Sequence, residues 1–147
     1  MQKENLIKSK KRVREYGEVF TPAWVVKKMC DYLPPEAWNI NKTILEPSCG
    51  NGNFLVEITA RKLDRCRSPA EGIQALKSIY GIDILPDNVA ECRKRMLDEY
   101  CLIFGDSQID RAKEVISNNI ICGDSLLIMN RLKQVDSWEK AVQHPAT

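Results

Sequence analysis

The sequence contains only one histidine, His144, which lies three residues from the end of the 147-residue chain. We interpret it as a tail residue, which leaves no histidine for a Ser-His-Asp triad, a Cys-His dyad or a multi-histidine metal site. The six cysteines form no Cys-x-x-Cys pair and follow no regular spacing, which argues against a zinc site and a secreted disulfide framework. No signal peptide or apolar run of ~18 residues is present, so we expect no membrane span and a cytoplasmic location.

Excess charge of either sign is also missing, because 22 basic residues face 20 acidic ones and the net charge is +2. No domain-wide basic field therefore indicates nucleic-acid binding. A local basic run precedes residue 15 and consists of Lys8, Lys10, Lys11, Arg12 and Arg14. We interpret this run as a solvated or frayed terminus, with phosphate contact as the alternative. The length suits one domain.

The most informative segment that is present is a glycine loop, EPSCGNGNF, at residues 46–54. The β-branched and apolar residues 43–46 before it predict a strand, and residues 53–65 after it predict a helix. Gly50 and Gly52 can take positive φ and leave no Cβ in the way of a ligand. A strand, a glycine loop and a helix N-terminus form the general arrangement that holds a nucleotide-like ligand.

This loop differs from two common phosphate-binding loops. The dinucleotide fingerprint needs a third glycine at position 55, where the sequence has Leu55. A phosphate loop needs a Gly-Lys-Ser/Thr sequence, which does not follow.

Two further apolar strands are predicted, and an acidic residue closes each of them. Residues 79–84 contain Asp83 with Pro86 after it, and residues 119–125 contain Asp124. An aspartate at the tip of the second strand can accept both hydroxyls of a ribose. Each acid alone is better explained as a loop or cap residue, but three acids that each close an apolar strand before a helix-like segment indicate one shared site.

The remaining pattern predicts helices between these strands. Thr21 as N-cap with Pro22 at the first position predicts a helix over residues 22–33. A capping box beginning at Ser68 predicts another helix that ends near residue 78, and further helices are expected over residues 86–100 and 107–117. Alternating strands and helices predict an α/β fold in which parallel strands are joined by right-handed crossovers.

The loop at residues 46–54 resembles motif I of S-adenosylmethionine-dependent methyltransferases. The segment GEVFTP at residues 17–22 resembles motif X of the amino-directed DNA methyltransferases. The segments around Asp83 and Asp124 follow the loop in the places of motifs II and III. This order of motifs X, I, II and III is similar to that of γ-class adenine-specific DNA methyltransferases of Type II and IIG restriction-modification systems, from Gly17 to about Leu126. The resemblance implies the amino-terminal half of a Rossmann-like methyltransferase fold, with an incomplete sheet.

The resemblance also implies a cofactor, S-adenosyl-L-methionine, and a set of residues that bind it. Glu46 and the loop backbone would hold the methionine part, Asp83 the ribose hydroxyls and Asp124 the adenine amino group, with Ile84 beside the adenine ring. The expected cofactor-binding residues are Phe20, Thr21, Pro22, Glu46, Pro47, Ser48, Cys49, Gly50, Gly52, Asn53, Phe54, Asp83, Ile84, Asp124 and Ser125.

The catalytic motif of this family, Asn/Asp-Pro-Pro-Tyr/Phe, does not occur in the chain. Its only Pro-Pro pair, Pro34-Pro35, stands between Leu33 and Glu36, ahead of the first strand. We therefore assign no catalytic residue and expect no DNA methylation by this polypeptide alone. Two explanations stay open: the chain is the amino-terminal part of a longer methylase, or it is a small protein that kept cofactor binding without catalysis.

The expected organisation is a basic arm at residues 1–15, a cofactor-binding domain at 16–130, and a tail or the start of a catalytic half at 131–147. The resemblance implies DNA as partner, through a carboxyl-terminal region outside this chain, and a restriction or specificity subunit. An exposed sheet edge predicts self-association. The alternatives are a nucleotide-binding or interaction module without methyl chemistry, and part of an RNA or protein amide methyltransferase.

Overall fold

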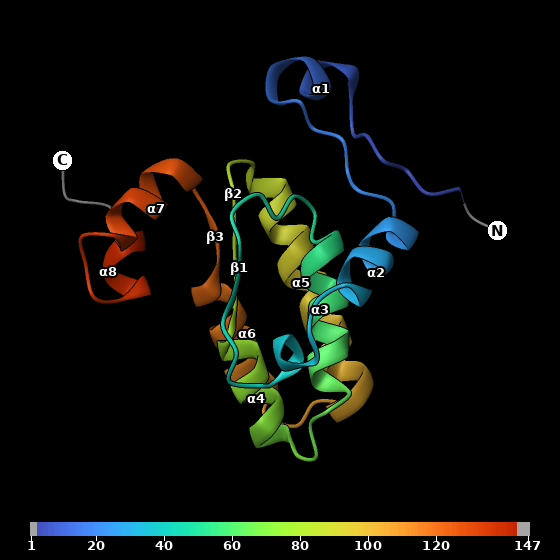
Figure 1. The fold of residues 1–147 in the computed structure, drawn as a ribbon, viewed down its shortest axis with the longest axis vertical. Helices are drawn as coiled ribbons and strands as arrows, with labels where there is room; N and C mark the ends of the chain where they lie inside the picture. Colours follow the sequence, from blue (N-terminus) through green and yellow to red (C-terminus); the bar gives the residue numbers. More distant parts are fainter. Residues whose placement is uncertain (1–2, 144–147) are drawn as a thin grey trace.

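A computed structural model describes residues 3–143 and contains one parallel sheet with helices on both faces (Figure 1). The three strands are β1 (Ile44–Glu46), β2 (Ile79–Asp83) and β3 (Ile120–Cys122), in the order β1-β2-β3. In register, Leu45 lies opposite Tyr80 and Ile82 lies opposite Ile121. The predicted parallel α/β architecture and the positions of its three strands are therefore confirmed.

One face of the sheet contributes to the main hydrophobic core, together with helices α3 (Asn53–Leu63), α4 (Pro69–Lys77), α5 (Pro86–Phe104) and α6 (Ile109–Asn119). Leu55, Ile79, Met96 and Tyr100 are all buried in this core. In Figure 1, α3 and α5 lie on the same side of the strands, with α4 and α6 towards the end opposite α1. This core fixes the carboxyl ends of the strands relative to the start of α5.

The opposite face of the sheet packs against α7 (Ser125–Leu132) and α8 (Trp138–Val142). Tyr80 and Ile82 point to this face because side chains alternate along a strand. Trp138 meets Tyr80 edge to face with ring centroids 4.8 Å apart, and its indole nitrogen donates to the Asn118 carbonyl at 2.9 Å. The helix-like segment expected after Asp124 is α7, whereas α8 was not among the helices expected from the sequence.

Residues ahead of the sheet form α1 (Lys10–Tyr16), α2 (Ala23–Asp31) and a 3-10 turn, η1 (Pro35–Trp38). Ser9 caps α1 by accepting from the Arg12 amide at 3.1 Å, and Gly17 ends it with φ 64°. A helix within the basic run differs from the expected solvated or frayed terminus. No helix within residues 3–143 is both long and apolar enough to span a membrane.

The expected N-cap of α2 is wrong. The helix begins at Ala23 with Pro22 as its cap residue, and the Thr21 side chain makes no capping hydrogen bond. The Glu4 carboxylate instead accepts from the Ala23 amide at 2.8 Å, and therefore satisfies an N-terminal donor that Thr21 was expected to satisfy. The cap of α4 agrees with the prediction, because Ser68 accepts from the Glu71 amide at 3.2 Å.

Candidate functional site

A cavity of about 530 Å³ opens at the carboxyl ends of the three strands. Its walls come from the segment before α2, the glycine loop after β1, the turn after β2 and the turn after β3. Of the fifteen residues expected to bind a cofactor, thirteen line it: Phe20, Thr21, Glu46, Pro47, Ser48, Cys49, Gly50, Asn53, Phe54, Asp83, Ile84, Asp124 and Ser125. Parallel strands bring these separate motifs to one edge of the sheet.

Pro22 and Gly52 are not among the lining residues. Pro22 lies at the start of α2, where its carbonyl accepts from the Val26 amide at 3.0 Å. Gly52 lies behind the loop with φ 100°, and a Cβ at this position would stand 2.9 Å from Cys92 Sγ. Its role is therefore close packing of the loop on α5.

Backbone hydrogen bonds hold the glycine loop on the end of β2. The Cys49 amide donates to the Ile82 carbonyl at 2.9 Å, and the Gly52 amide donates to the Cys49 carbonyl at 2.9 Å. Gly50 has φ 54°, and a Cβ there would lie 3.3 Å from the ring of Phe20. The glycine allows the loop to approach Phe20 closely, which joins two walls of the cavity.

Glu46 ends β1 and presents a half-buried carboxylate to the cavity. Its Oε1 accepts from the Ser48 amide at 3.0 Å. Burial raises the pKa of this carboxyl above its ordinary value, and the Ser48 hydrogen bond opposes the shift. A cationic ligand group would compensate the desolvated charge.

Asp83 ends β2 and accepts three hydrogen bonds. The Gly50 amide reaches its Oδ1 at 3.2 Å, and the Leu85 amide reaches its Oδ2 at 3.1 Å. The side-chain nitrogen of Asn88 reaches the same Oδ2 at 3.0 Å. The carboxylate therefore ties the glycine loop to the second strand while it also faces the cavity.

Asp124 is the N-cap of α7. Its Oδ1 accepts from the Leu126 amide at 3.0 Å and from the Leu127 amide at 3.3 Å. Asp124 therefore is a helix-cap residue, as each acid considered alone suggested. It also lines the cavity. The adjacent Gly123 amide donates to the Asp83 carbonyl at 2.9 Å, which holds the second and third strand ends together.

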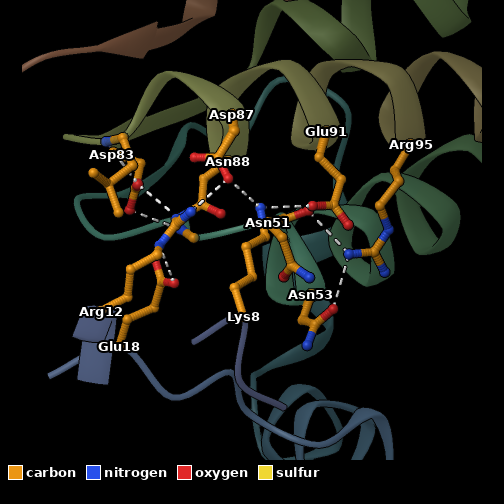
Figure 2. A network of polar contacts seen from close by, with 12 residues as sticks. Lys8, Arg12, Glu18, Asn51, Asn53, Asp83, Asp87, Asn88, Glu91 and Arg95 are labelled. Carbon is orange, nitrogen blue, oxygen red and sulfur yellow. Dashed lines mark hydrogen bonds and ion pairs between the residues drawn. The ribbon is translucent and has the colours of Figure 1, made fainter. Parts of the chain in front are cut away.

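The segment before α2 closes the cavity from the amino-terminal side. Phe20 is buried, and its amide donates to the Leu6 carbonyl at 2.7 Å. The Asn53 side chain donates to the Thr21 carbonyl at 2.8 Å and accepts from Arg95 at 2.8 Å, as Figure 2 shows in part. Asn53 thereby links this segment to the start of α3 and to α5.

The structure also adds lining residues that the sequence reasoning missed: Tyr16, Gly17, Glu18, Val19, Asn51, Leu85, Gly123 and Leu126. The GEVFTP block contains three of them, Gly17, Glu18 and Val19. Treating the whole block as part of the site would have predicted these three residues. Tyr16 stands directly before this block and Leu126 directly after Ser125, so both adjoin segments that the sequence had indicated.

Residues 4–99 match the sequence profile of the N-6 DNA Methylase family. The chain belongs to this family. A curated relative, the Type II methyltransferase M.VspI of Vibrio sp. (strain 343), is 33% identical over 96 residues. These residues make up 65% of this chain and 20% of the relative, so the comparison spans a fifth of that protein. No solved structure gave a significant match.

Membership of the N-6 DNA Methylase family confirms the resemblance that the motifs indicated. The matched region contains the GEVFTP block, the glycine loop and Asp83, and it ends within α5. Asp124 lies beyond it and is placed at the cavity by the fold alone. Within residues 3–143, no group of three or more His, Cys, Asp or Glu side chains is arranged to hold a metal ion; His144 lies outside the described residues.

Proposed function

We propose that this chain is the S-adenosylmethionine-binding portion of a site-specific DNA methyltransferase that modifies the exocyclic amine of adenine in a restriction-modification system. The observation that carries the proposal is the charge of the cavity. Four carboxylates line it, from Glu18, Glu46, Asp83 and Asp124, and the described lining residues include no lysine, arginine or histidine.

This charge distribution distinguishes between classes of nucleotide ligand. Phosphate groups would face carboxylates with no basic partner in the lining, so binding of ATP or a dinucleotide would be opposed by like charge. S-adenosylmethionine has no phosphate and carries a sulfonium and an ammonium, both positive. An acidic cavity favours this ligand, and the glycine loop allows it to approach the backbone.

Three of the four carboxylates have a proposed role that follows from their position. Glu46, whose pKa is raised by burial, would compensate the ammonium of the methionine part. Asp83 would contact the ribose hydroxyls through Oδ1, since its three present donors occupy three of its roughly four lone-pair sites and leave one free on this oxygen. Asp124 would accept the adenine amino group, since only its Oδ1 is engaged in capping within the described residues.

The proposal includes a Rossmann-like methyltransferase fold, with the cofactor domain at residues 16–130. When bound, the cofactor would supply an activated methyl group. DNA and the base that accepts the methyl would be held by residues outside this chain, because Asn/Asp-Pro-Pro-Tyr/Phe is absent from its sequence. Its carboxylates would bind and orient the donor.

Titration calorimetry of the 147-residue chain with S-adenosylmethionine and with ATP tests the proposal. We expect S-adenosylmethionine to bind more tightly than ATP. Asp83→Ala should weaken the binding ten- to a hundredfold, because a hydrogen bond to a charged group contributes about 1.5 to 3 kcal/mol. Asp98→Ala is the matched control, since Asp98 is an exposed acid on α5 paired with Lys94. Preferential binding of ATP would instead support the nucleotide-binding alternative.

A second measurement concerns catalysis by this chain. With labelled cofactor and duplex DNA, we expect no methyl transfer by the 147 residues alone. Transfer above the level of a no-protein control would show that groups within this chain can free the amine lone pair without the missing motif.

A further inference from the structure

Ion pairs connect the amino-terminal segment to the first turns of α5. Lys8 Nζ lies 2.8 Å from Asp87 Oδ2 and 3.1 Å from Glu91 Oε2. Arg12 Nη1 lies 2.6 Å from the same Asp87 oxygen. Figure 2 shows these residues side by side between the amino-terminal segment and α5. Two members of the basic run that the sequence suggested to be solvated are therefore in ion pairs with α5.

A second set of contacts runs from Arg12 towards the cavity. Arg12 Nε lies 2.8 Å from Glu18 Oε1, and Arg12 Nη2 donates to Glu18 Oε2 at 2.9 Å. The side-chain nitrogen of Asn88 donates to the same Glu18 oxygen at 2.7 Å and to Asp83 Oδ2 at 3.0 Å. An unbroken chain of polar contacts thus joins Arg12, Glu18, Asn88 and Asp83 (Figure 2).

Asn88 is the central member of this chain. It is fully buried, it does not line the cavity, and its single nitrogen donates to one carboxylate on each side. A side-chain amide nitrogen has two hydrogens, so both are used. Its Oδ1 is buried without a hydrogen-bond partner among the described residues. A buried acceptor without a partner costs stability, so the arrangement calls for an explanation, and a role in orienting the two carboxylates provides one.

We propose that Asn88 and Arg12 are positioning residues that set the orientation of Asp83 and Glu18 in the cavity. This inference rests on the proposed function, in which Asp83 contacts the ligand. Asn88 holds Asp83 together with the Gly50 and Leu85 amides, so the carboxylate is oriented before the ligand arrives. Such preorganisation reduces the entropy lost on binding. The positive charge of Arg12 offsets the repulsion between the carboxylates of Glu18 and Asp83, which Asn88 holds close together.

A double-mutant cycle tests the role of Asn88. In the 147-residue chain, Asn88→Ala should weaken S-adenosylmethionine about tenfold, as expected for loss of a hydrogen bond to a charged group. In the Asp83→Ala background, the same substitution should weaken binding less than twofold, because the carboxylate that it positions is gone. Val89→Ala is the control: this adjacent side chain is buried on α5 and, because it is apolar, makes no hydrogen bond to either carboxylate, so the substitution should lower stability and leave affinity unchanged.

Arg12 is tested by a charge-matched pair of substitutions. Arg12→Gln should weaken binding several-fold, whereas Lys11→Gln should leave affinity unchanged although it removes the same charge from the same helix. The Lys11 side chain is 73% exposed, and its one ion pair among the described residues is with Glu15 at 3.9 Å. Equal effects of the two substitutions would mean that net charge matters and position does not, which would overturn the assignment of Arg12.

The outcomes separate this inference from the function on which it rests. Suppose that the wild-type chain binds and Asp83→Ala weakens binding, but the Asn88→Ala effect is the same in both backgrounds. Asn88 then acts independently of Asp83, and this inference is wrong while the proposed function stands. Absence of binding by the folded wild-type chain would overturn the proposed function and this inference together. A tenfold effect that disappears in the Asp83→Ala background supports both.

Discussion

The side-chain nitrogen of Asn88 lies 2.7 Å from Glu18 Oε2, although the two residues are 70 positions apart in the chain. Glu18 comes from the segment between α1 and α2, and Asn88 lies in the first turn of α5. Their contact fixes one wall of the cavity to the helix that follows Asp83. The cavity is therefore assembled from distant segments and responds to residues that do not line it.

Glu46→Gln should have opposite effects on ligand binding and on stability. Binding of S-adenosylmethionine should fall about tenfold or more, because the ammonium loses a charged partner. The free energy of unfolding should rise at neutral pH. Burial raises the pKa of Glu46 in the folded state. At pH values above the ordinary pKa of a glutamate, the folded protein therefore binds more protons than the unfolded chain. Ionisation of Glu46 thus destabilises the folded protein, and a neutral glutamine removes this cost.

Calorimetry and urea unfolding of the same preparations measure both effects of Glu46→Gln. Glu57→Gln is a suitable control, since Glu57 lies on α3, the helix after the glycine loop, and pairs with Arg61 on the same helix. A fall in both affinity and stability would show that Glu46 has a structural role that the neutral amide cannot replace.

Asp87→Asn should loosen α1. Asp87 contacts both Lys8 and Arg12, so the substitution weakens two ion pairs that hold the amino-terminal segment. Trypsin should then cleave after Lys10, Lys11 and Arg14 several-fold faster, because proteolysis follows the population of the open form. Asp98→Asn on the same helix should not change this rate, since Asp98 pairs only with Lys94 among the described residues.

The same contacts predict how α1 responds to acid. Hydrogen bonds from Arg12 and Lys8 lower the pKa of Asp87 below its ordinary value of 3.8. A carboxyl with a lowered folded-state pKa stabilises the structure above its unfolded value, and this stabilisation is lost as the pH falls through the folded value. Amide hydrogen exchange should therefore show α1 protected from pH 7 down to about pH 4 and released only below it. Release near pH 6 would contradict the assignment.

Lys62 should make stability depend on pH in the alkaline range. Its side chain is fully buried and contacts the Lys42 carbonyl and Ser78 Oγ, and burial lowers its pKa to about 8. Between about pH 8 and the ordinary value of 10.5, the unfolded chain binds more protons, so the free energy of unfolding should rise with pH.

Urea unfolding from pH 7 to 10.5 measures this dependence, with Lys62→Met as the comparison. Burial raises the pKa of the nearby Cys66 thiol to about 11, so this thiol also titrates in the alkaline range. The difference in the free energy of unfolding between the two proteins removes the contribution of Cys66 and leaves that of Lys62. The difference should change by up to about 3 kcal/mol across this range. A flat difference would show that Lys62 stays charged in the folded protein.

Gly52→Ala should destabilise the protein more than Gly17→Ala. Both glycines have positive φ, so either substitution costs about 1 to 2 kcal/mol of backbone strain. A Cβ at Gly52 would also stand 3.1 Å from Cys92 Cα, whereas none of the described atoms lies within 4 Å of a Cβ at Gly17. Overpacking adds about 1 to 3 kcal/mol. Thermal or urea unfolding compares the two, and equal losses would show that the loop can move away from α5.

The sequence by itself determined the parts of this protein that depend on local chemistry. Apolar β-branched runs predicted three strands, and glycines and an acid at the first strand end predicted the loop. The rule that parallel strands present their carboxyl ends at one edge predicted that Glu46, Asp83 and Asp124 would line one site. Of the thirteen expected residues that lie at the cavity, eleven lie at or after the ends of the three strands, whereas Phe20 and Thr21 come from the segment before α2.

Only the tertiary structure decided the surroundings of those residues. The basic run forms a helix and pairs with α5, because Asp87 and Glu91 stand one turn apart where Lys8 and Arg12 can reach them. The cap of α2 comes from Glu4, which no local pattern around Thr21 could indicate. In the sequence, nothing distinguishes Asn88 from other polar residues near the start of a helix. Only the packed structure shows that its side chain joins two carboxylates. Contacts between segments depend on how the chain folds back on itself, and for that reason local sequence patterns did not contain them.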